Sequence, residues 1–235
     1  MRRTRRLLIA AIAAVTLGMA ACSTGLLPGG PAGDGVVDGD GGTGGGGRAG
    51  VGKVIYLTFD DGPSRETVQI LEVLSTYDAK AVFFAVGQNL AQQGDVARRI
   101  VAEGHVLANH TWNHADLTGL DDAGFDRELD ETAALLARLG SHSTCVRPPY
   151  GSTDDGVERE LVERGMHQVM WNVDTEDWTK PGVDHIVDRL LGVDSGDVIL
   201  MHDGGTGRKQ TAEALREALP ELAERGYAFE VVPGC

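Results

Sequence analysis

Histidine and aspartate side chains occur in this chain at spacings that suit a metal site. His110 and His114 are separated by three residues, and two adjacent carboxylates stand at Asp60 and Asp61. Two imidazoles and one carboxylate form a ligand set with open positions, which suits Zn²⁺ and tolerates Co²⁺ or another divalent ion. The remaining carboxylate would then be free to take a proton from water beside the metal. These groups together indicate metal-dependent hydrolysis of an acyl bond.

The spacing of the two histidines predicts a helical turn. Residues four apart lie on one face of a helix, so both imidazoles would reach the same ion. A strand sends neighbouring side chains to opposite sides, and a turn at Gly62-Pro63 must therefore bring Asp60 and Asp61 into one site. An isolated pair of histidines at this spacing is more often coincidental, so the nearby carboxylates carry the prediction.

Three further residues supply a cation, an acid and a partner for that acid. Arg147 precedes Pro148-Pro149, which fix the chain direction, and we expect it to hold the free carboxylate ionised. His202 follows an apolar run and would protonate the leaving group, while Asp177 would orient this imidazole and raise its pKa. Considered alone, Arg147 would be a surface ion pair and His202 a structural histidine at a strand end.

The sequence between these residues alternates between two periodicities. Apolar, β-branched runs predict strands at 54–59, 81–86, 105–108, 143–146, 168–173, 198–201 and 228–232. Amphipathic patterns predict helices at 65–75, 96–103, 123–139, 155–164, 183–191 and 211–225. This alternation predicts an α/β fold with about seven parallel strands, and the short apolar strands favour a barrel over an open sheet. Active sites of such barrels lie at the carboxyl ends of the strands, where the residues above would converge.

The N-terminal residues predict an export signal. Four arginines precede an apolar run that ends in Met19-Ala20-Ala21-Cys22, and the run is short for a membrane-spanning helix. We expect residues 1–22 to be a lipoprotein signal with lipidation at Cys22; the alternative is an ordinary cleavage site that ends in cysteine. The protein would then be exported to the cell envelope, either anchored at the outer face of the membrane or secreted.

The rest of the chain divides into a linker and one domain. Residues 23–50 are dominated by glycine and cannot bury a core, which predicts a flexible linker. Residues 51–235, about 185 in all, are enough for one catalytic domain with a single core. We expect this domain to be a monomer.

Charge and cysteine content restrict the partners and the redox state. The formal net charge of -14 disfavours nucleic acid or an anionic membrane surface as a partner, so that any membrane contact would be the lipid anchor. A neutral or cationic ligand fits better. Cys145 and Cys235 either form a disulfide, as an exported protein permits, or remain free thiols, and their spacing does not decide between the two.

The site residues lie within ordered motifs that resemble those of one known family. The motifs are Thr58-Phe59-Asp60-Asp61-Gly62-Pro63, His110-Thr111-x-x-His114, Arg147-Pro148-Pro149-Tyr150-Gly151, Asp174-x-x-Asp177-Trp178 and Leu200-Met201-His202. They are similar to the motifs of the polysaccharide deacetylase family, also called the NodB-homology domain or carbohydrate esterase family 4. The resemblance covers residues 51–232 and implies a distorted barrel.

The resemblance also implies a role for each motif residue. By similarity, Asp60 is the general base and Arg147 orients it. The metal, Zn²⁺ or Co²⁺, would be bound by three side chains, namely Asp61, His110 and His114. His202 would be the general acid, paired with Asp177, and the backbone amide of Tyr150 would donate to the oxyanion. Substrate contacts would come from Leu200, Trp178 and Pro149, with the first two lining a pocket for the acetyl methyl.

The activity implied is removal of N-acetyl groups from N-acetylglucosamine residues of a cell-wall or chitin-like glycan, with release of acetate. Peptidoglycan or another N-acetylglucosamine polymer would be the substrate, and residues 203–211 resemble the amide-cleaving members more than the xylan esterases. An O-acetyl esterase acting on acetylxylan is the alternative within the family. A tethered glycan-binding lipoprotein with a structural metal site is a more distant alternative. A structural site needs no spare acid, base or cation, whereas this sequence offers all three.

Overall fold

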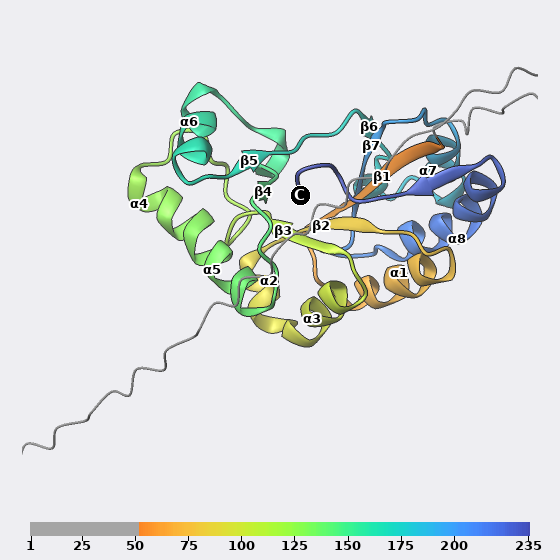
Figure 1. Ribbon diagram of the computed structural model, residues 1–235, viewed down its shortest axis with the longest axis horizontal. Coiled ribbons are helices and arrows are strands. Elements are labelled where there is room, and N and C mark those ends of the chain that lie inside the picture. The colour runs from red at the N-terminus through yellow and green to blue at the C-terminus, as the bar shows by residue number, and fades with distance from the viewer. Residues whose placement is uncertain (1–51) are drawn as a thin grey trace, which may run out of the picture. The chain divides into compact units, whose positions relative to one another are not determined.

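The computed structural model describes residues 52–235. The expected signal at 1–22, with its lipidation site Cys22, and the expected linker at 23–50 lie outside the described residues. The strands are β1 (Lys53–Asp60), β2 (Ala81–Ala85), β3 (Val106–Asn109), β4 (Cys145–Val146), β5 (His167–Gln168), β6 (Val173–Asp174), β7 (Val198–His202) and β8 (Tyr227–Phe229). They form one sheet in the order β5-β4-β3-β2-β1-β7-β6, with β8 paired to β1 (Figure 1).

All pairings in this sheet are parallel, which confirms the predicted architecture. The sheet curls into a half-barrel rather than a closed one, because β5 and β6 do not pair with each other among the described residues. Parallel strands bring their carboxyl ends to one edge, and that edge carries the predicted site residues.

The two-residue period of β1 gives this sheet two different faces. Leu57 and Phe59 are fully buried and pack in the main core on the outer, helix-covered face. Thr58 and Asp60 alternate with them and therefore point to the inner face. The register of β1 and β7 places Thr58 opposite Leu200 and Asp60 opposite His202. Two predicted site residues thus become neighbours on the inner face through strand register alone.

Helices cover the outer face of the sheet, and Figure 1 shows α1, α3 and α8 along this side. The helices are α1 (Arg65–Thr76), α2 (Gly87–Gln92), α3 (Gly94–Ala102), α4 (Asp122–Phe125), α5 (Glu131–Arg138), α6 (Asp155–Glu163), α7 (Val183–Leu191) and α8 (Lys209–Glu224). The side chain of Ser64 caps α1 and accepts a hydrogen bond from the backbone N–H of Glu66. Within residues 52–235, none of the helices is long and apolar enough to cross a membrane.

The prediction of one continuous helix over 123–139 is wrong in its middle. A π-helical turn, Asp126–Asp130, separates α4 from α5. Within this turn the carboxylate of Glu128 is buried and accepts hydrogen bonds from the backbone of the loop that follows β3. The helix thus changes from α-helical to π-helical hydrogen bonding at the residue that bonds to another segment. The helical periodicity of the sequence gives no sign of such a contact.

The predicted strand 168–173 is also wrong, since it divides into β5 and β6. Between them, the carbonyl groups of Val169 and Met170 accept hydrogen bonds from the side chain of Arg147. These carbonyl groups therefore face a buried guanidinium, and a single strand does not continue through this segment.

The C-terminal segment covers part of the inner face. Val232 and Cys235 pack with residues of β2, β3 and β4 in a smaller core. Cys145 and Cys235 form a disulfide with a Cα–Cα distance of 5.4 Å, so the first of the two alternatives for these cysteines holds. The disulfide fixes this segment to β4, which ends directly before Arg147.

Candidate active site

A cavity of about 510 Å³ opens at the carboxyl ends of the strands. Most of the predicted site residues line it, namely Asp60, Asp61, His110, His114, Tyr150, Trp178, Leu200 and His202. Arg147 and Asp177 are buried, and each contacts one of the lining side chains. Pro149 is buried too, and Pro148 lines the cavity in its place. The structure thus brings residues from separate strand ends to one cavity.

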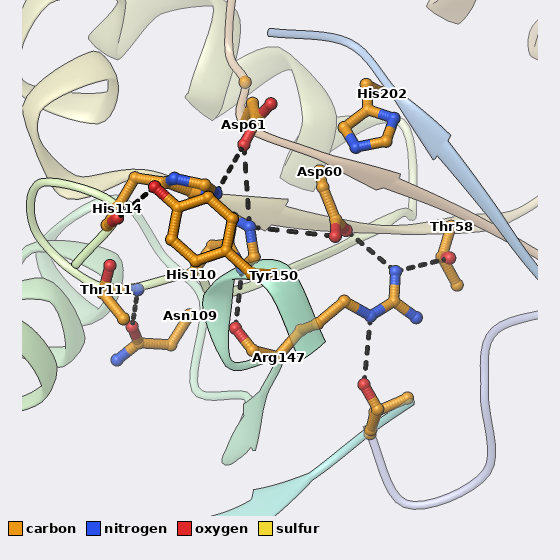
Figure 2. A network of polar contacts seen from close by, with 12 residues as sticks. Thr58, Asp60, Asp61, Asn109, His110, Thr111, His114, Arg147, Tyr150 and His202 are labelled. Atoms are coloured by element: carbon orange, nitrogen blue, oxygen red, sulfur yellow. Dashed lines mark hydrogen bonds and ion pairs between the residues drawn. The ribbon is translucent and has the colours of Figure 1, made fainter. Parts of the chain in front are cut away.

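Asp61, His110 and His114 form a group suited to a divalent metal ion. Their donor atoms all lie within 4.8 Å of one another. Asp61 Oδ1 is 3.3 Å from His114 Nε2 and 3.6 Å from His110 Nε2 (Figure 2). Ligands about 2.0–2.1 Å from a tetrahedral zinc ion are about 3.4 Å apart, so this arrangement needs little change to hold one. The donor set and its geometry therefore fit the expected metal.

The two histidines do not lie on a helical turn, and that prediction is wrong. Residues 110–114 form a loop in which Thr111 and His114 have left-handed backbone angles, with φ of 66° and 63°. The N–H of Thr111 donates to the Asn109 side chain, and the next two N–H groups donate to Glu128. The side chains of Asn109 and Glu128 thus accept the hydrogen bonds of three successive backbone N–H groups. They hold the loop in a shape that brings the two imidazoles together without a helix.

His110 is held in one tautomer. Its Nδ1–H donates to the carbonyl oxygen of Arg147 at 2.6 Å, which leaves the lone pair of Nε2 directed towards Asp61. Burial lowers the pKa of His110 to about 3, although the charge of Asp61 opposes this effect. A neutral imidazole with a free Nε2 is the form that binds a metal ion.

Asp60 is paired with the buried cation Arg147. The Nη1 atom of Arg147 donates to Asp60 Oδ1 and to Thr58 Oγ1, both at 2.8 Å (Figure 2). The guanidinium also donates to the carbonyl groups of Val169 and Met170, and its side chain has no exposed surface. Burial raises the pKa of Asp60, while Arg147 opposes the rise through its charge and hydrogen bond. Arg147 thereby directs the carboxylate, and the pKa of Asp60 stays above its ordinary value because the effect of burial is the larger one.

His202, which lines the same cavity, forms a second pair with Asp177. Its Nδ1 lies 2.7 Å from Asp177 Oδ1, and Asp177 Oδ2 accepts from the His202 backbone and from the Thr211 hydroxyl. Burial favours a lower pKa for His202, but the hydrogen bond and charge of Asp177 outweigh it, and the pKa is raised. An imidazole of this kind can carry a proton near neutral pH and give it up from Nε2.

The rim of the cavity is more exposed and more aromatic. Tyr150 is 73% exposed and Trp178 is 55% exposed, whereas Leu200 is buried at the cavity wall. The Tyr150 ring stands edge-on to His114 with 4.6 Å between ring centroids, and the residue itself has a φ of 62°. An exposed aromatic rim beside a small apolar wall suits a sugar that carries a short acyl group.

Sequence reasoning missed several residues that support the predicted ones. Thr58 binds Arg147, and its position two residues before Asp60 in a strand was a usable signal. Thr211 holds Asp177, and Arg208 lines the cavity with Nη2 3.9 Å from Asp61 Oδ2. The last two lie in the segment 203–211, which was noted only for its resemblance, and no signal marked either residue because each acts on a residue distant in the chain.

A second group of metal-type donors consists of Cys145, His167 and Cys235. The two sulfur atoms are bonded to each other, so this group offers no thiolate ligand in the structure. The group at the cavity is therefore the better candidate for a metal.

Known proteins resemble this chain in sequence and in fold. The family model for polysaccharide deacetylase matches residues 47–169. A peptidoglycan-N-acetylglucosamine deacetylase of Bacillus cereus is 36% identical over 184 residues, covering 77% of this chain and 86% of that protein. A chitooligosaccharide deacetylase of Rhizobium leguminosarum bv. trifolii is 38% identical over 193 residues, covering 76% and 90%. A structure of a family 4 carbohydrate esterase from Streptomyces lividans, in complex with acetate, has a TM-score of 0.73 at 33% identity and covers 77% of this chain and 94% of that one.

Proposed function

The chain belongs to the polysaccharide deacetylase family, and we propose that it is a metal-dependent enzyme that hydrolyses N-acetyl groups of N-acetylglucosamine residues in a cell-wall or chitin-like glycan. The products would be acetate and a glucosamine unit. One observation carries this proposal: a carboxylate and an imidazole, each with its own buried partner, face the same cavity as the three-residue donor group. These are the base, the acid and the metal ligands that amide hydrolysis requires.

The metal ligands are assigned to Asp61, His110 and His114, and Zn²⁺ is the ion we favour, with Co²⁺ as the substitute. An ion held there supplies Lewis acidity, which polarises a carbonyl group and lowers the pKa of water. The hydrogen bond from His110 Nδ1 to Arg147 keeps one imidazole correctly oriented for this task.

Asp60 is assigned as the general base. It accepts the proton of the attacking water through Oδ2, because Oδ1 is already bonded to Arg147. Arg147 fixes the direction of this carboxylate and opposes the effect of burial on its pKa. The base is thus oriented before the substrate binds.

His202 is assigned as the general acid. Its Nδ1 is bonded to Asp177, so Nε2 is the atom that donates a proton to the departing amine nitrogen. The raised pKa of His202 keeps this proton available near neutral pH. Asp177 orients the ring and stabilises its charged form, and Thr211 holds Asp177 in place.

The acetyl group is assigned to the wall between Leu200 and Trp178, which both line the cavity. A small apolar surface there would accept the methyl and exclude larger acyl groups. The Tyr150 backbone amide is proposed to donate to the oxyanion, and Pro148 rather than Pro149 is the proline placed to contact the substrate. The left-handed conformation of Tyr150 supports a functional reason for its backbone position.

The substrate and location are proposed from different lines of support. Relatives are described as acting on peptidoglycan and on chitooligosaccharides, which share N-acetylglucosamine. The basic and apolar pattern of residues 1–22, with Cys22 at its end, supports export and a lipid anchor, and residues 23–50 support a linker. We therefore favour peptidoglycan or another envelope glycan as the substrate.

An O-acetyl esterase is the second candidate, and the resemblance to the Streptomyces lividans esterase favours it. Amide and ester hydrolysis use the same base and metal, but they differ in the leaving group. An amine needs protonation by His202 more than an alcohol does, because an alcohol leaves more readily. The buried pair formed by His202 and Asp177 therefore supports the deacetylase over the esterase.

Acetate release tests this proposal directly. The protein is assayed on peptidoglycan, chitin oligomers and acetylxylan in parallel, with zinc, with cobalt and with a chelator. We expect release from the N-acetylated glycans, which the chelator abolishes and either metal restores. Asp60→Asn is expected to lose turnover and keep its metal. Release from acetylxylan alone would favour the esterase, and no release with retained glycan binding would favour the structural-metal alternative.

A further inference from the structure

The two segments that carry the proposed metal ligands share an unusual backbone feature. Asp61, Thr111 and His114 all have left-handed conformations, with φ of 73°, 66° and 63°. Such angles are disfavoured for residues with side chains, so contacts from the surrounding structure must maintain them. The contacts that do so therefore help to place the metal ligands.

Asp203 holds the segment that carries Asp61. Its side chain is 1% exposed, with Oδ1 accepting from the Gly62 backbone N–H at 3.1 Å and Oδ2 from the Thr67 hydroxyl at 2.5 Å. The Asp203 carbonyl accepts from the Ser64 hydroxyl, and its backbone N–H donates to the Asp60 carbonyl at 3.0 Å. This one residue therefore bonds to the chain both before and after the ligand Asp61.

Packing around Asp203 leaves the turn no room to relax. A Cβ atom added at Gly62 would lie 2.0 Å from the Asp203 carboxylate, and one at Gly204 would lie 2.1 Å from the Asp61 backbone. The Asp203 side chain therefore packs directly on Gly62, and the backbone of Gly204 packs on that of Asp61, both at positions where only glycine fits. The position of the Asp61 side chain thus depends on the placement of Asp203.

Glu128 does the same for the loop between the two histidines. Its side chain is 6% exposed, and Oε2 accepts from the backbone N–H groups of Trp112 and Asn113 at 3.0 and 3.1 Å. These two residues lie between His110 and His114 in the chain. Glu128 belongs to the π-helical turn, Asp126–Asp130, where the neighbouring Leu129 carbonyl accepts from the Asn109 side chain at 2.9 Å. Two successive residues of the π-helical turn, Glu128 and Leu129, thus bond to the end of β3 and to the loop that follows it.

We propose that Asp203 and Glu128 are positioning residues for the metal site: each buried carboxylate binds backbone N–H groups beside left-handed residues and thereby fixes the ligands Asp61 and His114. Neither carboxylate reaches the donor group itself or lines the cavity. Their effect passes through the backbone, in the way that outer hydrogen-bond partners orient metal ligands. This inference rests on the metal site of the proposed function.

The test compares metal affinity with stability in the same variants. Asp203→Ala and Glu128→Ala remove the acceptors, whereas Asp203→Asn and Glu128→Gln keep an acceptor oxygen. Zinc affinity is measured by competition with a chromophoric chelator, and the melting temperature is measured without metal. Asp154, an exposed residue at the start of α6 and away from the cavity, provides a control that matches Glu128 in its hydrogen bonds, because it accepts two backbone N–H bonds at 2.8 and 2.9 Å.

The alanine variants are expected to bind zinc about 10–100-fold more weakly than the wild type, and the Asn and Gln variants to fall between. The visible absorption of the cobalt-loaded protein should change in the same order. Asp154→Ala is expected to lower the melting temperature while its zinc affinity stays within about twofold of the wild type. If an alanine variant does not fold, the Asn or Gln variant carries the test.

The positioning role is overturned if the Asp203 and Glu128 variants bind zinc within about twofold of the wild type. It is overturned as well if Asp154→Ala weakens zinc binding as much as they do, because the effect would then follow from stability alone. A wild-type protein that binds no zinc would overturn the metal site itself and this inference with it. The two failures are therefore distinguishable.

Discussion

Replacing Arg147 by methionine should destabilise the protein strongly, because it leaves a buried carboxylate without its cation. Arg147 has no exposed side-chain surface, and Asp60 is nearly as buried. Burial removes water from both charged groups, and it thereby raises the pKa of Asp60 and lowers that of Arg147. Their mutual contact at 2.8 Å offsets this cost in the native protein, and Arg147→Met removes the offset.

The size of the effect follows from the geometry of the pair. Removal of one partner from a buried ion pair costs about 3–5 kcal/mol. For a domain of this size that corresponds to a fall in melting temperature of about 6–20 °C. Asp60→Asn alone should cost less than Arg147→Met, because the guanidinium keeps its bonds to Thr58, Val169 and Met170.

A double-mutant cycle measures the pair itself. Urea unfolding is followed for the wild type, Arg147→Met, Asp60→Asn and the double variant, all with chelator so that metal binding does not contribute. The double variant carries neither buried charge, and we expect it to be more stable than Arg147→Met. The coupling energy between the two sites should reach about 2–3 kcal/mol, within the range for residues in direct contact.

Two results would refute this reasoning. One such result is a loss of less than about 1 kcal/mol in the free energy of unfolding for Arg147→Met. The other is that the effects of the two substitutions are additive to within about 0.5 kcal/mol. In either case the two charges do not compensate for each other's burial. Asp60 would then need another source of stabilisation, and the role of Arg147 in orienting the base would be lost.

Other perturbations test separate parts of the structure. Asp177→Asn should lower kcat/KM by about 10²–10⁴-fold and move the basic limb of its pH profile to lower pH, because the raised pKa of His202 depends on that carboxylate; a limb at the wild-type pH would contradict this. Reduction of the Cys145–Cys235 disulfide, which closes a separation of 90 residues, should lower the free energy of unfolding by about 4–5 kcal/mol, as measured by urea unfolding with and without a reductant. His105 is neutral in the native protein because burial lowers its pKa to about 4, whereas the unfolded chain binds a proton near pH 6.5. Stability is therefore lost as pH falls, by about 2 kcal/mol between pH 7.5 and 5, and His105→Leu should remove this part of the pH dependence.

The positions of the proposed catalytic groups were predictable because they depend on short-range rules. The apolar alternation of β1 places Asp60 at its end, and the parallel arrangement brings His202 to the same edge. The family resemblance then separated the two neighbouring carboxylates, which residue chemistry alone could not do. Asp60 contacts Arg147, and Asp61 contacts the histidines.

The conformations of the connecting segments were not predictable, because they depend on hydrogen bonds from distant residues. A spacing of four residues suggested a helical turn for His110 and His114, but Glu128 binds the loop between them. The break between β5 and β6 likewise accompanies the buried side chain of Arg147. A periodic pattern reports which face of an element is apolar, and it carries no information on such contacts.

The two halves of the site differ in how many strands pair beside them. Asp60 ends β1, which pairs with β2, β7 and β8, and His202 ends the adjacent β7. His110 and His114 instead follow β3, which pairs with β2 over four residues but joins β4 through the single pair Asn109 and Val146. Local opening is easiest where few backbone bonds must break. We therefore expect fluctuations of the histidine loop to begin on its β4 side and to allow exchange of the proposed metal, while Asp60 and His202, the proposed base and acid, stay in register.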